Sequence, residues 1–426
     1  MRERELEVAQ AKANAFDLLD DLGCGIEVKP VLNDYTWTAS LTKRSPRGDL
    51  IEGSGKGVRP EEAEIGAIFE TIEHFSLVNY GEHASIFPVQ ARAILDKHAP
   101  GDLGVIEYIL KGQLDASMYA AEFNDLSGKR KKIFPLGIHC PAYVHDCIDD
   151  TSQLKGEDVF DYSELRKYSS SNGMAAGSTL AEALVHAISE VAERQSVGEF
   201  LVKCVGAEVE KIRLNAIESL PVDLQRLQRR ACESAGAEVY LIDLTGEAGI
   251  PTYLAYLDDE HPYSRCITMG SSLYPDYAVS RALTEMIQSV EVIRAATAYG
   301  GGTMAERTEK MFSRFRRVSY SGYERFEFFR LREFIHNGKF IAVNFSDQPP
   351  CPEFSSLDAH VVELCRRLAL ERKEVWYRLT HDWSDLHNVI CIQAVLTPYD
   401  PSFLLMHGIP VAFSDRMIKA AANPNL

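Results

Sequence analysis

Residues 171–200 read SNGMAAGSTLAEALVHAISEVAERQSVGEF, a glycine-rich segment followed by a regular pattern of apolar and charged residues. The pattern predicts a helix over residues 180–200, with Ser178 or Thr179 as N-cap, because a hydroxyl group can accept a hydrogen bond from the first helical N–H groups. One face of this helix carries four polar side chains within a sector of roughly 80°. They are Glu182, His186, Glu190 and Glu193. The opposite face is apolar, so the segment predicts an acidic stripe with a buried back.

The same pattern recurs at two other places in the chain. A shift of 120 residues lays residues 53–75 over residues 173–195, and a third, fainter copy starts near Gly270. Each copy is a glycine-rich turn that leads into a helix, and each helix carries a glutamate followed three residues later by a glutamate or glutamine. These pairs are Glu70 and Glu73, Glu190 and Glu193, and Glu285 and Gln288. Three such elements predict a shared centre.

The acidic pairs favour a site for divalent cations. Carboxylates brought together without counter-ions repel one another by a few kcal/mol at reduced dielectric. Mg²⁺ removes this cost, and it binds carboxylate oxygens together with water and phosphate oxygens. We therefore expect several Mg²⁺ ions that hold a triphosphate. The alternative is a solvated acidic face, but such a face usually carries basic partners, and Arg194 is the single basic residue in the interior of the predicted helix.

No other common motif competes for the function. The segment 53–57, GSGKG, has a lysine among glycines but lacks the P-loop spacing, and neither a dinucleotide-binding nor a hydrolase signature is present. Two histidines and two cysteines lie within residues 139–147, where they could form a zinc site or a nucleophile with its base. The usual metal-ligand spacings are missing there, so a structural role is favoured.

Composition indicates a folded protein without a membrane anchor. The 426 residues are 46% hydrophobic and 25% charged, and no apolar run approaches the roughly 18 residues of a membrane span. The net charge of −17 argues against a protein that coats a nucleic-acid polymer. The nine cysteines show no repeating spacing, and the charged N-terminus is not a secretion signal. We therefore expect reduced thiols and a cytoplasmic location.

The chain interleaves predicted helices and strands, which is typical of a mixed α/β or α+β fold. A helix is expected over residues 5–22, ended by Gly23. The predicted strands are 35–41, 84–87, 132–138, 239–244, 252–257, 340–345, 375–379 and 389–395. No linker-like segment divides the chain, so residues 1–426 are expected to form a single large domain.

These motifs together resemble the YcaO family. The segment 171–179, with Glu182 and the acidic pair that precedes Arg194, resembles the family's hallmark strand–turn–helix. The segment 55–57 with the first acidic pair resembles an earlier motif, and residues 282–288 resemble a later one. The likeness runs over roughly residues 5–300. Strands and helices of residues 301–426 are expected to complete a YcaO-like domain built around Mg²⁺ and ATP.

The resemblance implies an enzyme that uses ATP to phosphorylate an amide oxygen, after which a nucleophile displaces phosphate. A Cys, Ser or Thr side chain gives an azoline, sulfide gives a thioamide, and an amine gives an amidine. By position, Mg²⁺ would be held by Glu70, Glu73, Glu190 and Glu193. Contacts to the nucleotide or its phosphates would come from Arg4, Lys56, Ser171, Asn172, Glu182, His186, Arg194, Glu285 and Gln288. No catalytic residue is assigned.

The chain departs from the family pattern at several positions. Ala175 stands in place of a serine, His186 in place of a glutamine, and His74 in place of an arginine, while Val290 stands where a further arginine is expected. The metal ligands are retained. These departures therefore affect the expected nucleotide affinity or base identity more than metal binding.

The leading expectation is formation of a thioamide or thiolactam in a natural-product or modification pathway. Azoline-forming members usually end in a proline-rich tail, whereas residues 421–426 read AANPNL, and no leader-peptide-binding domain is recognised. The substrate would be a peptide amide or a small lactam such as a nucleobase, with a sulfur-donor protein as partner. The alternatives are azoline or amidine formation on a ribosomal peptide, a non-catalytic homologue that assists another enzyme, and a metal-dependent hydrolase. The family habit favours a homodimer.

Overall fold

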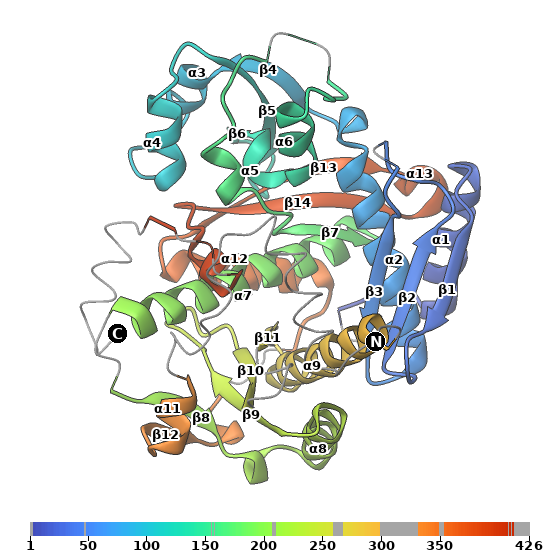
Figure 1. The fold of residues 1–426 in the computed structure, drawn as a ribbon, viewed down its shortest axis with the longest axis vertical. Coiled ribbons are helices and arrows are strands. Elements are labelled where there is room, and N and C mark those ends of the chain that lie inside the picture. Colours follow the sequence, from blue (N-terminus) through green and yellow to red (C-terminus); the bar gives the residue numbers. More distant parts are fainter. Residues whose placement is uncertain are drawn as a thin grey trace.

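The computed structural model describes residues 3–46, 48–154, 156, 158–206, 210–258, 267–298, 331–348, 353–407, 409 and 411–412. Helices and strands alternate along the chain, so the mixed α/β class is confirmed (Figure 1). None of the described helices is both long enough and apolar enough to cross a membrane. Residues 299–330, which follow Ala298, lie outside the described residues. So do residues 1–2 and 413–426, which include the segment 421–426 discussed above.

The strands form three sheets. The first has the antiparallel order β1 (Ile26–Pro30), β2 (Thr36–Leu41) and β3 (Glu52–Lys56). The second has the order β11 (Ile267–Ser271), β10 (Thr252–Asp258), β9 (Glu238–Asp243), β8 (Ile212–Asn215) and β12 (Phe340–Val343). The third has the order β4 (Ile86–Gln90), β5 (Ser117–Asn124), β13 (Glu374–Asp382), β14 (Ile390–Thr397) and β7 (Met174–Gly177), with β6 (Lys131–Pro135) paired to β5.

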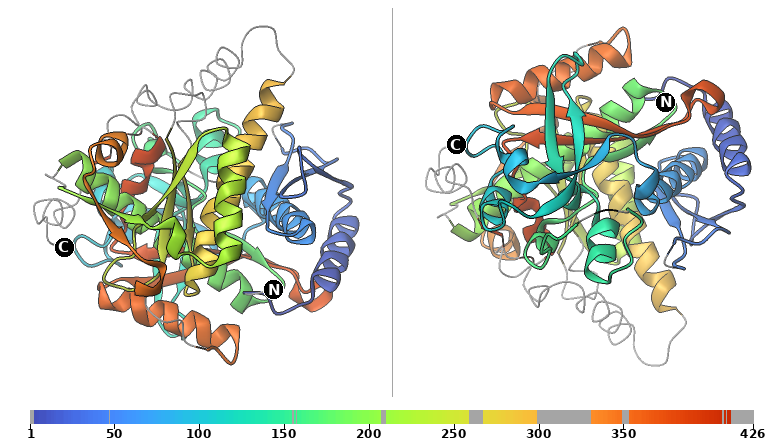
Figure 2. Two further views of the ribbon diagram at one scale, coloured as in Figure 1. Left: turned by 90° about the horizontal axis from the view of Figure 1, so that it is seen from below. Right: turned by 90° about the horizontal axis from the view of Figure 1, so that it is seen from above.

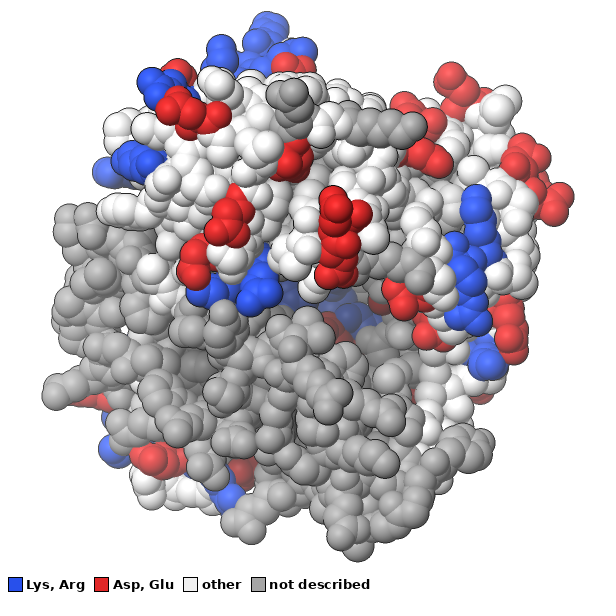
Figure 3. Space-filling view, turned by 45° about the horizontal axis from the view of Figure 1, so that its top comes forward, with Lys and Arg blue, Asp and Glu red and all other residues white. Residues whose placement is uncertain are grey.

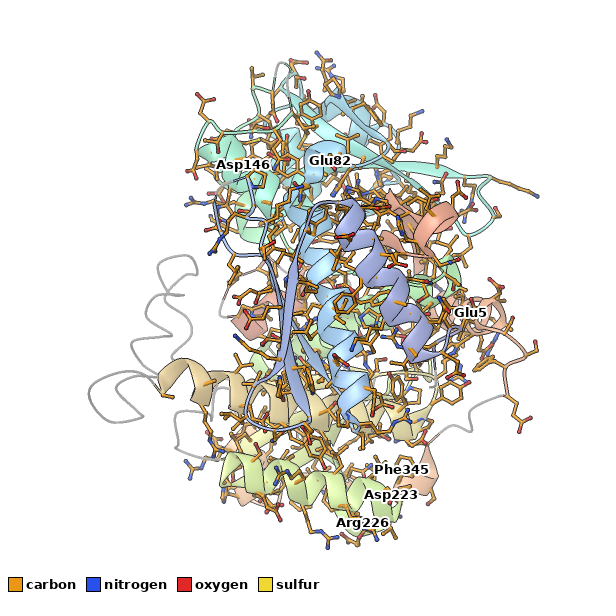
Figure 4. The ribbon with its side chains drawn as sticks, turned by 90° about the vertical axis from the view of Figure 1, so that its right-hand side faces the viewer. Glu5, Glu82, Asp146, Asp223, Arg226 and Phe345 are labelled. Atoms are coloured by element: carbon orange, nitrogen blue, oxygen red, sulfur yellow. The ribbon has the colours of Figure 1, made fainter. Side chains whose placement is uncertain are left out.

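Each sheet packs against a long helix. The long helices are α1 (Val8–Asp21), α2 (Pro60–Val78), α7 (Leu180–Gly206), α8 (Val222–Ala235), α9 (Pro275–Thr297) and α12 (Leu357–Leu370). The first sheet and α1 both pack on α2 (Figure 4). The third sheet packs on α7, whose other contacts include α12. Helices α8 and α9 pack on each other, and both contact the second sheet. Helix α9 also reaches β3, which brings the first and second sheets together (Figure 2).

Shorter helices fill the connections. They are α3 (Ala91–Leu95), α4 (Val105–Lys111), α5 (Leu136–His139), α6 (Pro141–Ile148), α11 (Leu331–His336) and α13 (Ser384–His387). Helices α3 to α6 gather around β4, β5 and β6 at the top of Figure 1.

An edge strand of every sheet leads directly into one of three helices. Strand β3 precedes α2, β7 precedes α7, and β11 precedes α9. Glycine permits the close packing of strand on helix in these units, as two positions show. A Cβ at Gly55 would lie 1.8 Å from the carbonyl oxygen of Ala63, and a Cβ at Gly270 would lie 2.1 Å from that of Ala278. The strand backbone can therefore lie directly against the first turns of the helix that follows it.

Most predicted strands lie close to their observed positions, but one is wrong at its end. The predicted strand 132–138 stops at Pro135, and the next four residues form α5. Proline has no N–H to continue the ladder of hydrogen bonds, which accounts for the early end. Strand β5 was not predicted, because its alanines and glutamate are not typical strand residues.

Candidate functional site

Helices α2, α7 and α9 surround a cavity of about 400 Å³. Four positions with the same spacing line it on each helix. They are Glu62, Gly66, Glu70 and Glu73 on α2, Glu182, His186, Glu190 and Glu193 on α7, and Tyr277, Arg281, Glu285 and Gln288 on α9. Figure 3 shows a hollow near the centre of the molecule in which Lys and Arg side chains gather beside acidic ones. The three helices thus present matching faces to one space.

The acidic stripe of α7 is an interior surface and not a solvated face. Glu182 and Glu193 are only 6% and 4% exposed, although both line the cavity. The helix begins where the sequence predicted, because Thr179 Oγ1 accepts a hydrogen bond from the N–H of Glu182 at 3.2 Å. The alternative of a solvated acidic face is therefore wrong for this helix.

Two basic residues from outside these helices pair with glutamates of the cavity. Arg4 Nη1 lies 3.1 Å from Glu182 Oε1, and its guanidinium also lies over the ring of Phe69. Lys56 Nζ, at the end of β3, lies 2.5 Å from Glu285 Oε2. These pairs tie the N-terminal segment to α7 and the first sheet to α9.

Two further glutamates of the cavity accept hydrogen bonds from backbone groups. The N–H of Ala176 donates to Glu73 Oε1 at 2.9 Å, and the N–H of Gly173 donates to Glu190 Oε1 at 3.2 Å. Glu193 Oε2 is buried and has no hydrogen-bond partner in the part of the chain that the structure describes. A buried carboxylate oxygen without a donor is costly, so this atom is well suited to bind a cation.

Burial makes most of these carboxylates hard to ionise. It raises the pKa of Glu193 to about 7 and the pKa of Glu73 well above its ordinary value, and it also raises the pKa of Glu70 and Glu182. Glu285 differs, because burial is outweighed there by Lys56 and two arginines, and its pKa is lowered. A cation that binds in the cavity would displace protons from the glutamates with raised pKa values, so that their carboxylates become charged.

The donor set fits Mg²⁺ only in combination with a second ligand. Among the described residues, no group of three or more His, Cys, Asp or Glu side chains is arranged to hold an ion unaided. Mg²⁺ is usually held by one or two carboxylates plus water and substrate phosphates. The pairs of glutamates around this cavity could supply the carboxylate ligands and leave room for water and phosphate.

Tyr277 and Arg281 are among the cavity residues that sequence reasoning missed. Arg281 Nη1 lies 3.3 Å from His186 Nδ1, and burial together with this arginine holds the pKa of His186 well below its usual value. The signal was present, because the shift that aligns Glu285 with Glu190 also aligns Arg281 with His186. Extending the alignment by two helical turns toward the N-terminus would have found both.

All but one of the residues expected to contact the nucleotide line the main cavity, as do the four expected metal ligands. The exception is Asn172, which lines a second, smaller cavity together with Arg194. Of the positions that depart from the family pattern, His74 lines the main cavity and Ala175 is fully buried beside it in β7. The possible metal site within residues 139–147 does not form among the described residues.

Comparison with protein families gives a match over most of the chain. A family model described as "YcaO cyclodehydratase, ATP-ad Mg2+-binding" matches residues 54–395. An uncharacterized protein of Methanothermobacter thermautotrophicus is 34% identical over 160 residues, and the match spans 37% of this chain and 38% of that protein.

Two solved structures share the fold. The structure of YcaO from Methanopyrus kandleri bound with AMPPCP and Mg²⁺ matches with a TM-score of 0.62 and 17% identity, covering 96% of both chains. A heterocyclase in complex with substrate and cofactor matches with a TM-score of 0.64 and 16% identity. The second match covers 92% of this chain and 52% of that one. The YcaO-like fold expected from the sequence is therefore confirmed.

Proposed function

Since the chain belongs to the YcaO family, we propose that it uses ATP and Mg²⁺ to convert an amide or lactam carbonyl into a thioamide or thiolactam. ATP and Mg²⁺ are the ligands named for the family, and cyclodehydration is its named reaction. The observation that supports ATP-dependent chemistry in this chain is the shared cavity. Its buried glutamates have raised pKa values and include an oxygen without a partner.

The proposed roles follow from how each side chain is held. Glu70, Glu73, Glu190 and Glu193 would hold Mg²⁺, since all four line the cavity and burial raises the pKa of Glu70, Glu73 and Glu193. Within the described part of the chain, neither Arg194 nor Arg281 forms an ion pair with a carboxylate, so both guanidinium groups would bind phosphate oxygens. Arg4 and Lys56 would either bind phosphate in place of Glu182 and Glu285 or keep these ion pairs when the nucleotide binds.

ATP supplies the phosphoryl group that turns the amide oxygen into a leaving group. The residues of this chain bind the phosphates, keep the carbonyl in line and exclude water. We propose that the nucleophile is sulfide delivered by a donor protein. Azoline or amidine formation is the alternative within the same chemistry.

Calorimetric titration of ATP, with and without Mg²⁺, tests the site. Wild type should bind ATP only with Mg²⁺, and Glu190→Ala should weaken binding by about 100-fold or more. Glu233→Ala, which removes an exposed carboxylate from α8, is the matched control and should bind like wild type. Unchanged Mg²⁺-dependent affinity in both Glu190→Ala and Glu193→Ala would rule out these metal ligands.

Mass spectrometry of the product distinguishes the reactions. Incubation with candidate amides and a sulfide donor should exchange oxygen for sulfur, whereas azoline formation would remove one water without any donor. Product formed without sulfide would refute the thioamide proposal while leaving ATP-dependent activation intact.

A non-catalytic homologue is the second candidate. Its support is the Arg281–His186 contact, which places a guanidinium and a neutral imidazole where the family pattern has a glutamine. It predicts ATP binding without turnover for any amide. Restoring the family residue with His186→Gln and measuring phosphate release distinguishes the two, because turnover gained only in that variant would favour the non-catalytic reading.

A further inference from the structure

A second cavity adjoins the proposed ATP site. It has a volume of about 20 Å³ and shares the side chain of Arg194 with the main cavity. A site needs roughly 10–15 Å³ to hold one water-sized molecule, so this space takes a single small guest. The residues that give it polar character are His139, Ser170, Asn172, Gln195 and Asp400.

Two polar atoms of its walls lack a hydrogen-bond partner among the described residues. His139 Nε2 and Asn172 Oδ1 are both buried without a hydrogen bond, and His139 is only 3% exposed. Burial lowers the pKa of His139 to about 3, so its imidazole is neutral. Buried polar atoms beside a space of this size normally bind a small polar molecule.

Arg194 places a guanidinium at the junction of the two cavities. It contacts two thioether sulfurs, Met406 Sδ at 3.3 Å and Met269 Sδ at 3.9 Å, and its charge also acts on Glu193 and Glu285 of the main cavity. Asp400 also lines the smaller cavity, but its Oδ1 accepts hydrogen bonds from the N–H and the hydroxyl of Ser402. A guest that accepts a hydrogen bond from Arg194 and donates one to Asn172 Oδ1 suits these walls, and a hydrosulfide ion can do both.

We propose that the smaller cavity is a nucleophile subsite that holds one hydrosulfide ion beside the ATP cavity. The proposal rests on the thioamide function above and names where its sulfur nucleophile waits. Hydrosulfide attacks the activated carbon, a C–S bond forms, and the C–O bond to phosphate breaks. The phosphate leaves with the electron pair of that bond and takes up the proton from sulfur, so no oxidant or reductant is needed. Water in the same place would only return the amide.

The test is a crystal structure of the protein soaked with sodium hydrosulfide, read by long-wavelength sulfur anomalous diffraction. Wild type should show an anomalous peak in the smaller cavity. His139→Phe should lose the peak, because phenylalanine keeps the packing on Phe123 and Phe134 but removes the polar nitrogen. His98→Phe is the matched control, since this buried imidazole also packs on Phe134 but lines neither cavity, and it should keep the peak.

A second variant tests the subsite independently, in case His139→Phe does not fold. Ala394→Val narrows the cavity from β14, and it should also lose the peak. Both variants should bind ATP and Mg²⁺ as wild type does and should raise the KM for sulfide by about tenfold or more. Density for water alone in soaked wild type, or a peak that survives both variants, would overturn the subsite. Because the soak needs no ATP, its result is independent of whether the proposed function holds.

Discussion

The two faces of α7 are both buried, yet they bury opposite kinds of side chain. The back face, with Leu184, Ile188 and Val191, belongs to an apolar core shared with β14. The front face carries the acidic stripe, whose burial raises pKa values instead of releasing free energy. The comparison teaches that burial alone does not define a core. The face that is costly to bury is the one that a ligand must complete.

The largest expected effect comes from making the back face resemble the front. Ile188→Asp places an unpaired carboxylate at a fully buried position of the apolar core. We expect a loss of more than about 4 kcal/mol in the free energy of unfolding, enough to unfold the protein. Far-UV circular dichroism and size exclusion measure it. A folded Ile188→Asp protein would mean that the two faces differ less than their contacts indicate.

The next largest effect comes from removing a charge from the front face, with Glu193→Gln. The pKa of Glu193 is about 7 in the folded protein and about 4.5 in the unfolded one, so ionisation opposes folding. Wild type without Mg²⁺ should lose stability as the pH rises from 4.5 to 7, and then stay level. Glu193→Gln should remove this loss and be more stable than wild type at pH 8 by on the order of 3 kcal/mol.

Urea unfolding of both proteins at pH 5 and pH 8 measures this difference. The advantage of Glu193→Gln should be small at pH 5, and Mg²⁺ with ATP should reverse it at pH 8 by stabilising wild type alone. An advantage of equal size at both pH values would show that the cost does not come from the charge.

The smallest effect concerns the ion pair between Lys56 and Glu285, in which the carboxylate already has a cationic partner. Lys56→Met leaves Glu285 without its ammonium partner, and about 1–2 kcal/mol of stability should be lost at pH 8. Because the pKa of Glu285 is lowered in wild type, its contribution is present above pH 4.5 and is lost as the pH falls through the folded pKa. The difference between wild type and Lys56→Met should therefore shrink in acid, as followed by urea unfolding across the pH range.

The sequence predicted the site better than it predicted the sheets. Periodicity places side chains on a helix face reliably, so the stripe of α7 and its N-cap at Thr179 are as expected. Residue identity cannot show where a loop turns away from a cavity, and Asn172 faces the smaller cavity although its neighbour Ser171 lines the main one. Strand pairing is set by distant partners. The adjacency of β14 and β7 joins residues that lie more than two hundred positions apart.

The cavity is surrounded by three helices that follow strands of three separate sheets, and this has a mechanical consequence. A ligand that contacts α2, α7 and α9 at once acts as a cross-link between units that otherwise meet through limited packing. Its binding free energy is shared by all three, so β3, β7 and β11 should become protected from hydrogen exchange together and by the same factor. The site would then set how cooperatively the whole molecule unfolds.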